Sequence, residues 1–227
     1  MKKFAIIEIG SNNTKTHVYE DGNVIYENTT TIKLKANYTA LGCYSNVDFD
    51  GNICVFIGGG GSIELIFVNN KEVIDRKYYN FGVVDVTSEF PSLKDDIPTC
   101  TFDEVYNYVD NLINDLTIKA DLLILGGGDH IYWYTNAEYG MLENTLYKND
   151  NQKYMITKDM SDIYDRDALV TSLDRIRNNS DNPSWFDGSR AMKVITNMIS
   201  NKIDAKYIIP TKINMEDGIK EMLMKEI

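Results

Sequence analysis

The chain has 227 residues, of which 43% are apolar and 25% charged, and its formal net charge is −11. This length and apolar share suffice for one sizeable core or two small ones, which excludes a disordered chain. The acidic balance argues against DNA as a partner, because nonspecific affinity for nucleic acid comes mostly from lysine and arginine. No run of 18 apolar residues occurs, so we expect no membrane span and a cytoplasmic protein.

Cysteine and histidine are too few and too poorly spaced for the common zinc sites. Cys43, Cys54 and Cys100 form no C-x-x-C pair, and their odd number does not indicate a disulfide framework. Only two histidines occur, so a bound cation would take oxygen ligands. Magnesium is therefore the expected metal, in a reducing cytosolic setting.

A segment near the N-terminus is repeated at an offset of 49 residues. FAIIEIGSNNTKTHVYEDGNVI, which starts at Phe4, matches ICVFIGGGGSIELIFVNNKEVI, which starts at Ile53. Each copy reads as an apolar strand, a turn rich in glycine, serine or asparagine, a return strand, a two-residue turn and a third strand. We place the two-residue turns at Asp21-Gly22 and Asn69-Asn70. The repeat predicts two antiparallel meanders of three strands.

Helical and strand patterns alternate after the second copy. Residues 101–104 have the spacing of a capping box, and residues 121–125 and 205–210 read as short buried strands. Residues 214–217 predict the start of a final helix. Helical apolar stripes lie at Val105, Val109, Leu112, Ile113 and Leu116, at Leu169, Leu173 and Ile176, and at Met192, Ile195 and Ile199.

Three glycine-rich segments, at residues 10–14, 58–62 and 126–128, each follow an apolar strand. Backbone N–H groups in such a turn can converge on an anion, since glycine has no Cβ to block its approach. A single glycine run more often makes only a tight hairpin. Three such runs after apolar strands favour a phosphate-binding cleft.

Five stretches resemble, in order, the motifs of one protein family. They are EIGSNNTKTHVYE, GGGSIEL, YNFGVVDVTSEF, LILGGGDHI and IIPTKINMEDGIKEML. The first two are similar to the D-I-G-S-N-S and D-I-G-G-G-S-T-E-L phosphate motifs of the exopolyphosphatase and guanosine-pentaphosphatase (Ppx/GppA) family of the actin-like ATPase superfamily. The others resemble the segment that follows the second motif, the third glycine motif, and the closing strand and helix.

This resemblance implies an α/β, ribonuclease-H-like (actin-like ATPase) fold, with a reduced N-terminal lobe at residues 1–45 and one complete lobe at residues 46–227. It implies a phosphatase that binds terminal phosphates of polyphosphate or guanosine polyphosphate between two hairpins and hydrolyses phosphoanhydride bonds with magnesium present. The implied phosphate-binding residues are Gly10, Ser11, Asn12, Asn13, Gly59, Gly60, Gly61, Ser62, Gly127 and Gly128. Glu8 and Glu64 are the implied catalytic residues and magnesium ligands.

The chain departs from the family pattern at three places. Glu8 replaces an aspartate but keeps a carboxylate that can bind magnesium through water. Ile57 replaces the aspartate of the second motif and can neither bind a metal nor take a proton. Only residues 36–52 separate the two meanders, where the family has a longer segment that carries its catalytic glutamate. Because general-base catalysis contributes roughly 10²- to 10⁴-fold, we expect weak or absent hydrolysis.

Four functions remain open from the sequence. The chain could be a phosphohydrolase, or a catalytically inactive regulatory protein that binds phosphate or nucleotide. A sugar or acetate kinase of the same superfamily would need an acidic base and a nucleoside pocket. A structural role would use the uncovered first meander, with a homodimer covering it. The aromatic stretches at residues 78–79 and 132–134 would then be interface anchors or core.

Overall fold

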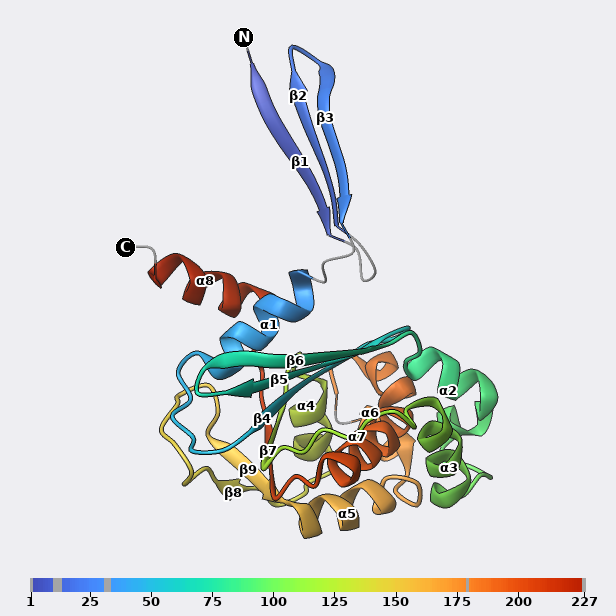
Figure 1. Cartoon of the computed structure of the whole chain (residues 1–227). Helices are drawn as coiled ribbons and strands as arrows, with labels where there is room; N and C mark the ends of the chain where they lie inside the picture. Colours follow the sequence, from blue (N-terminus) through green and yellow to red (C-terminus); the bar gives the residue numbers. More distant parts are fainter. Residues whose placement is uncertain (1, 10–13, 31–33, 179, 226–227) are drawn as a thin grey trace.

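Figure 1 shows the computed structural model of the chain, which describes residues 2–9, 14–30, 34–178 and 180–225. Its strands form two separate sheets. A first sheet has the order β1-β2-β3, and a second, seven-stranded sheet has the order β6-β5-β4-β7-β10-β9-β8. No described helix is long and apolar enough to cross a bilayer.

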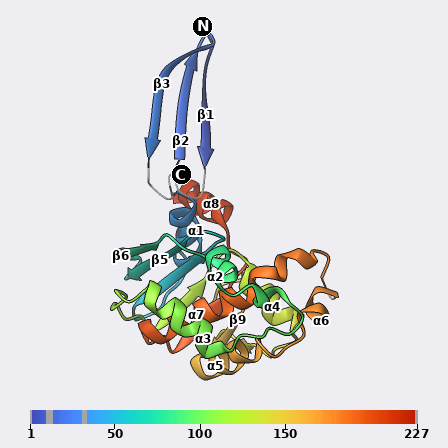
Figure 2. The ribbon, with the colours of Figure 1, turned by 90° about the vertical axis from the view of Figure 1, so that its right-hand side faces the viewer.

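The first sheet is the predicted N-terminal meander. It consists of β1 (Lys3–Ile9), β2 (Thr14–Glu20) and β3 (Asn23–Thr30), all antiparallel. Asp21 and Gly22 connect β2 to β3 with φ angles of 47° and 85°, the left-handed conformation that two-residue hairpins favour. Figures 1 and 2 show this sheet standing away from the rest of the molecule, above α1 and α8.

The second meander reproduces the first at the predicted offset. It consists of β4 (Ile53–Gly58), β5 (Ile63–Asn69) and β6 (Glu72–Tyr79). Even the irregularity in register recurs, between Val18 and Tyr19 in one copy and between Phe67 and Val68 in the other. The duplicated architecture is therefore confirmed in the structure.

The position of the second two-residue turn was wrong. Asn69 still pairs with Glu72 as the last residue of β5. The residues with positive φ are Asn70 at 50° and Lys71 at 63°. The turn is therefore Asn70-Lys71, which matches Asp21-Gly22 at an offset of 49 residues.

Two predicted strands complete the centre of the second sheet. β7 (Leu122–Leu125) lies parallel to both β4 and β10 (Tyr207–Pro210), as their continuous apolar sequences indicated. The sequence did not predict β8 (Leu142–Glu143) or β9 (Tyr154–Thr157), which extend the sheet beyond β10. Both are short, and β8 is exposed, so neither carries a clear apolar pattern.

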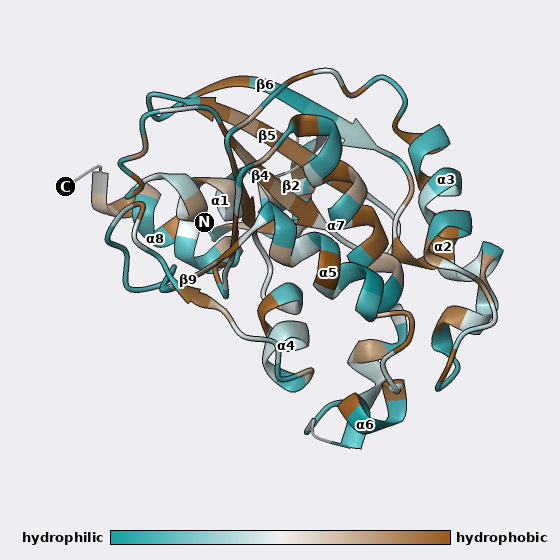
Figure 3. Cartoon of the chain, turned by 90° about the horizontal axis from the view of Figure 1, so that it is seen from below, coloured by the Kyte–Doolittle hydropathy of each residue, from teal (hydrophilic) through white to brown (hydrophobic). Residues whose placement is uncertain are grey.

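Helices cover both faces of the second sheet (Figure 1). One face carries α1 (Leu34–Tyr44), against which α8 (Met215–Lys225) packs. The other carries α2, α3 and α7, and Figure 3 shows α7 and α5 on this side of the strongly apolar strands β4 and β5. Their bounds are α2 (Val83–Glu89), α3 (Phe102–Leu112), α4 (Asp129–Asn136), α5 (Lys158–Asp167), α6 (Leu173–Asn178) and α7 (Ser189–Ile203), with the 3-10 helices η1 (Pro91–Lys94) and η2 (Pro183–Gly188).

Alternate residues of β4 supply the cores on the two faces. Phe56 belongs to the larger core under α7, whereas Val55 and Ile57 contact the core under α1, as the two-residue period of a strand requires. Ala36 and Ala40 place α1 in this second core. Helix α1 thus packs with the second sheet, although the boundary at residue 45 assigns it to the N-terminal lobe.

The predicted capping box begins α3. The Glu104 carboxylate accepts the Thr101 N–H at 2.7 Å, and Thr101 Oγ1 accepts the Glu104 N–H at 3.3 Å. Four residues of the predicted stripe are buried, but Leu112 is 37% exposed. Leu112 is the last residue of α3.

Candidate functional site

The turn between β4 and β5, residues Gly59 to Ser62, is the candidate phosphate hairpin. The Gly59 N–H donates to the Ser62 carbonyl at 2.9 Å, which closes the turn. The first N–H groups of α2 bind the carbonyls of Gly59 and Gly60, at 3.1 and 2.8 Å. No described residue accepts a hydrogen bond from the N–H groups of Gly60 and Gly61, and both glycines are exposed. These two N–H groups can therefore bind an anion.

Gly82 holds the hairpin against α2. A Cβ at this position would lie 2.4 Å from the Gly59 carbonyl oxygen and 2.6 Å from that of Gly60. The Asp85 carboxylate accepts the Gly82 N–H at 2.8 Å, which fixes the start of the helix. The sequence motif YNFGVVD thus has a structural purpose, which is to place α2 directly behind the phosphate hairpin.

Ser62 and Glu64 lie side by side at the start of β5, because residues two apart on a strand share a face. The Ser62 hydroxyl donates to Glu64 Oε1 at 3.0 Å, and Glu64 is only 9% exposed. Its cross-strand neighbour is Ile57, which is buried in the core beneath α1. The structure therefore puts an apolar side chain beside the Glu64 carboxylate.

The described residues contain no group of three or more histidine, cysteine, aspartate or glutamate side chains that could hold a metal. Glu8, the other predicted ligand, lies on β1 opposite Lys15, in the sheet that stands away from the second meander. Gly10, Ser11, Asn12 and Asn13 lie outside the described residues. Binding of phosphate from both sides thus stays a prediction.

The third glycine segment leads from β7 into α4. Gly127 and Gly128 have φ angles of 98° and 90°, a conformation that glycine adopts most easily. The Gly126 and Gly127 N–H groups donate to the carbonyls of Phe56 and Ile213. Gly127 is exposed and a Cβ there would meet no described atom within 4 Å. Gly128 is buried and is the N-cap of α4.

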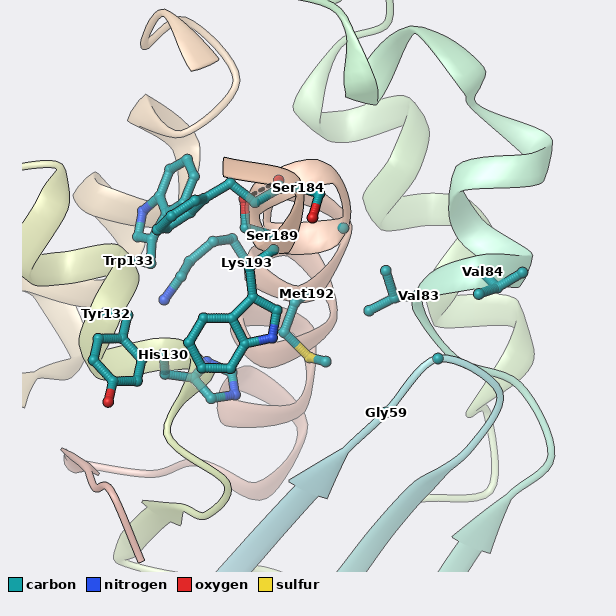
Figure 4. A pocket seen from close by; sticks show the side chains of 14 residues that line it. Gly59, Val83, Val84, His130, Tyr132, Trp133, Ser184, Ser189, Met192 and Lys193 are labelled. Atoms are coloured by element: carbon teal, nitrogen blue, oxygen red, sulfur yellow. Dashed lines mark hydrogen bonds between the residues drawn. The ribbon is translucent and has the colours of Figure 1, made fainter. Parts of the chain in front are cut away.

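A cavity of about 410 Å³ separates the phosphate hairpin from α4. We call it the aromatic cavity; Gly59 and Gly60 form one side of it. Its main side chains are His130, Tyr132, Trp133, Trp185, Phe186 and Lys193 (Figure 4). Of the predicted interface anchors, Trp133 and Tyr134 are instead buried in the core, as the alternative reading had it. The sequence did not predict the contributions of η2 and α7.

Lys193 is a buried lysine in the wall of the aromatic cavity. It is 1% exposed, and its Nζ has no hydrogen-bond partner among the described residues. The ammonium lies 3.6 Å from the centre of the Tyr134 ring, a favourable cation–π contact. Burial lowers the pKa of Lys193, although the nearby Asp165 carboxylate acts in the opposite direction.

Asp165 is the buried acid whose charge acts on Lys193. It accepts hydrogen bonds from Ser161 at 2.7 Å and from Asn197 at 3.3 Å. Burial raises the pKa of Asp165 from its ordinary value of 3.8 to about 6, although Lys193 and these hydrogen bonds lower it. The folded chain therefore holds this proton at pH values where the unfolded chain has released it.

We expect Asp165→Asn to remove part of the pH dependence of stability. Between about pH 4 and pH 6 folding takes up the Asp165 proton, so this group makes the wild-type protein less stable as pH rises. The free energy of unfolding of the wild type, minus that of the variant, should fall across this window. Urea unfolding at pH 4, 5 and 6 measures it, with exposed Asp150→Asn as control. A constant difference would contradict the expectation.

Solved structures of low sequence identity share this fold. The Ppx/GppA phosphatase of Aquifex aeolicus, in its type II variant, matches at a TM-score of 0.68 with 15% identity, over 99% of this chain and 100% of that one. An exopolyphosphatase from Cytophaga hutchinsonii matches at 0.67 with 11% identity, over 100% and 99%. No protein-family model and no curated protein matches the chain. The expected α/β fold class is thereby confirmed.

Proposed function

We propose that the chain binds terminal phosphates of polyphosphate or guanosine polyphosphate at the phosphate hairpin and hydrolyses phosphoanhydride bonds slowly, as a divergent member of the Ppx/GppA family. One observation carries this proposal: the exposed N–H groups of Gly60 and Gly61 lie beside the Ser62–Glu64 pair. The fold shared with the Aquifex and Cytophaga phosphatases supports it. Gly127 and Gly128 would approach the ligand from the α4 side.

Glu64 is the residue proposed to orient the attacking water. Phosphoryl transfer needs positioning and charge stabilisation more than covalent chemistry from the protein. The hairpin N–H groups would stabilise the phosphoryl oxygens, while Ser62 holds the carboxylate through its hydroxyl. Because Ile57 supplies no second acid, we expect turnover to be slow.

Magnesium would enter this site together with the phosphates. The ion is usually held by one or two carboxylates and by substrate oxygens rather than by an all-protein cage. Glu64 would be its ligand in the second meander, and Glu8 would supply a second carboxylate from the first. The residues described at the hairpin alone provide a single carboxylate, so ligand and metal should bind together.

Glu64→Gln should lower phosphate release from polyphosphate or guanosine pentaphosphate by about 10²-fold, the lower end of a general base's contribution. Glutamine keeps the size of the side chain and its acceptor for Ser62. Phosphate is measured with and without magnesium, and Glu72→Gln, an exposed substitution on β6, is the matched control. Equal rates for both variants would exclude Glu64 as the base.

A regulatory protein that binds phosphate without cleaving it is the second candidate. The placement of Ile57 beside Glu64 favours it, because the apolar group removes an acid from the cleft. Calorimetric titration with pyrophosphate distinguishes the two functions. Binding without release of phosphate would establish the regulatory protein, and absence of heat and of thermal stabilisation would exclude both.

We also propose that a second copy of this chain covers the first sheet. In the second meander, β7 pairs with the edge of β4 and helices cover both faces. The first sheet pairs with no other described strand, and Phe4, Ile6 and Tyr26 are each about half exposed. Light scattering at micromolar concentration should give twice the mass of one chain, and a monomer would exclude the dimer.

The cysteines support a cytoplasmic setting, which we include in the proposal. All three are free thiols in the structure, and Cys43 and Cys54 are buried. Burial raises the pKa of Cys43 to about 12, so its thiolate, the reactive form, is scarce at neutral pH. Such thiols persist most readily in a reducing compartment.

A further inference from the structure

The aromatic cavity has the size of a ligand site. Its volume of about 410 Å³ falls within the range of about 300–1,000 Å³ that small-molecule sites occupy. Tyr132 and Trp185 form one wall, with ring centres 5.0 Å apart, and Trp133 and Phe186 form another at 6.3 Å. Such walls suit a flat ring that can stack.

Three buried polar groups of the cavity lining lack a partner among the described residues. They are the Lys193 ammonium, the Trp133 indole N–H and His130 Nδ1. His130 is 2% exposed, and burial keeps its pKa well below the ordinary value. Figure 4 shows the Lys193 side chain extending toward Tyr132 and Trp133. An unpaired buried polar group is costly. A ligand that accepts a hydrogen bond from Lys193 and also forms one with His130 Nδ1 would therefore stabilise this site.

The charges around the cavity restrict the ligand further. Among its described lining residues none carries a carboxylate, in a chain of net charge −11. Outside it, Lys212 Nζ lies 5.3 Å from the centre of the Tyr132 ring. The buried Lys193 charge is already balanced in part by Asp165. A neutral ring with carbonyl and ring-nitrogen acceptors therefore fits better than a second buried anion.

We propose that the aromatic cavity binds the heteroaromatic base of a nucleotide. Gly59 and Gly60 belong to its wall, so phosphates attached to such a base would extend to the exposed N–H groups of the hairpin. This step rests on the proposed function and selects, within it, a ligand with a base over inorganic polyphosphate. The base itself is held by Trp185, Tyr132 and Lys193, independently of any phosphate.

Nucleosides without phosphate test this site separately from the hairpin. The chain has two tryptophans, Trp133 and Trp185, and both line the cavity, so tryptophan fluorescence reports on it directly. Guanosine and adenosine should quench the emission saturably, and Trp185→Ala should weaken nucleoside binding, measured by calorimetry, at least tenfold. Trp185 is 49% exposed, so its removal should leave the fold intact, which circular dichroism checks.

Two further variants make the result specific. Trp185→Phe keeps an aromatic wall and should retain affinity within about threefold, since a base can stack on any aromatic side chain. Tyr154→Ala removes an aromatic side chain of similar exposure on β9 and should bind nucleoside as the wild type does. Absence of saturable binding by both nucleosides, or equal affinity in Trp185→Ala, overturns the proposal. Pyrophosphate binding tests the hairpin independently of the cavity. If the chain binds pyrophosphate but no nucleoside, the proposed function stands and the inference about the cavity is wrong.

Discussion

Arg190→Met is expected to lower the free energy of unfolding by about 3–5 kcal/mol, because several buried carbonyls lose a donor at a cost of roughly 1–3 kcal/mol each. Arg190 is fully buried in α7. Its guanidinium donates to five backbone carbonyls, those of Leu93, Asp95, Asp96, Ala168 and Thr171. Leu93 and Asp95 lie in and at the end of η1, and Ala168 is the C-cap of α5. The substitution removes the Arg190 donor from all five carbonyls.

Thermal and urea unfolding measure this change. For a chain of this length the expected loss corresponds to a fall in Tm of about 10 °C. Arg175→Met removes the same charge from an exposed position and should change stability by less than about 0.5 kcal/mol. Arg190→Lys should lie between the wild type and the methionine variant, because three ammonium protons cannot reach five carbonyls. Equal stability of the two methionine variants would contradict the role assigned to Arg190.

The fold was predictable wherever local pattern and tertiary structure agree. The repeated segment predicted both meanders, because the two-residue period of a strand and the residue types of a tight turn can be recognised in the sequence alone. The same holds for β7 and β10, whose apolar sequences are those of buried parallel strands. Helix α1 was not predicted. Its buried apolar side chains, Ala36, Ala40 and Cys43, are small, so its stripe is weak and only packing on the second sheet reveals it.

The candidate site was predictable only in part, for a related reason. Ser62 and Glu64 are two residues apart on one strand, so the strand period alone brings them together. The aromatic cavity is different, because Trp185 and Lys193 come from η2 and α7 and reach Tyr132 of α4 only through the fold. Trp185 has an aromatic neighbour in sequence but no spacing that indicates a ligand. The unpaired state of Lys193 could be known only from its surroundings.

Gly82→Ala is expected to displace the phosphate hairpin. The added methyl group would need to lie 2.4 Å from one carbonyl oxygen and 2.6 Å from the next, and both oxygens also accept the N–H groups of Val83 and Val84. Neither neighbour is a flexible side chain, so α2 and the hairpin must separate. Overpacking of this kind costs about 1–3 kcal/mol, and we expect pyrophosphate affinity to fall at least tenfold, about 1.4 kcal/mol in binding free energy.

Gly140→Ala provides the matched control for this substitution. A Cβ at Gly140 would meet only the Tyr164 hydroxyl, at 3.8 Å, so neither stability nor pyrophosphate binding should change. Urea unfolding and calorimetry on both variants separate the two effects of Gly82→Ala. If the variant loses stability but binds pyrophosphate as the wild type does, the ligand does not contact the Gly60 and Gly61 N–H groups. If Gly82→Ala keeps both its stability and its pyrophosphate affinity, α2 does not hold the hairpin in place. A backbone carbonyl cannot accommodate a methyl group at 2.4 Å without moving.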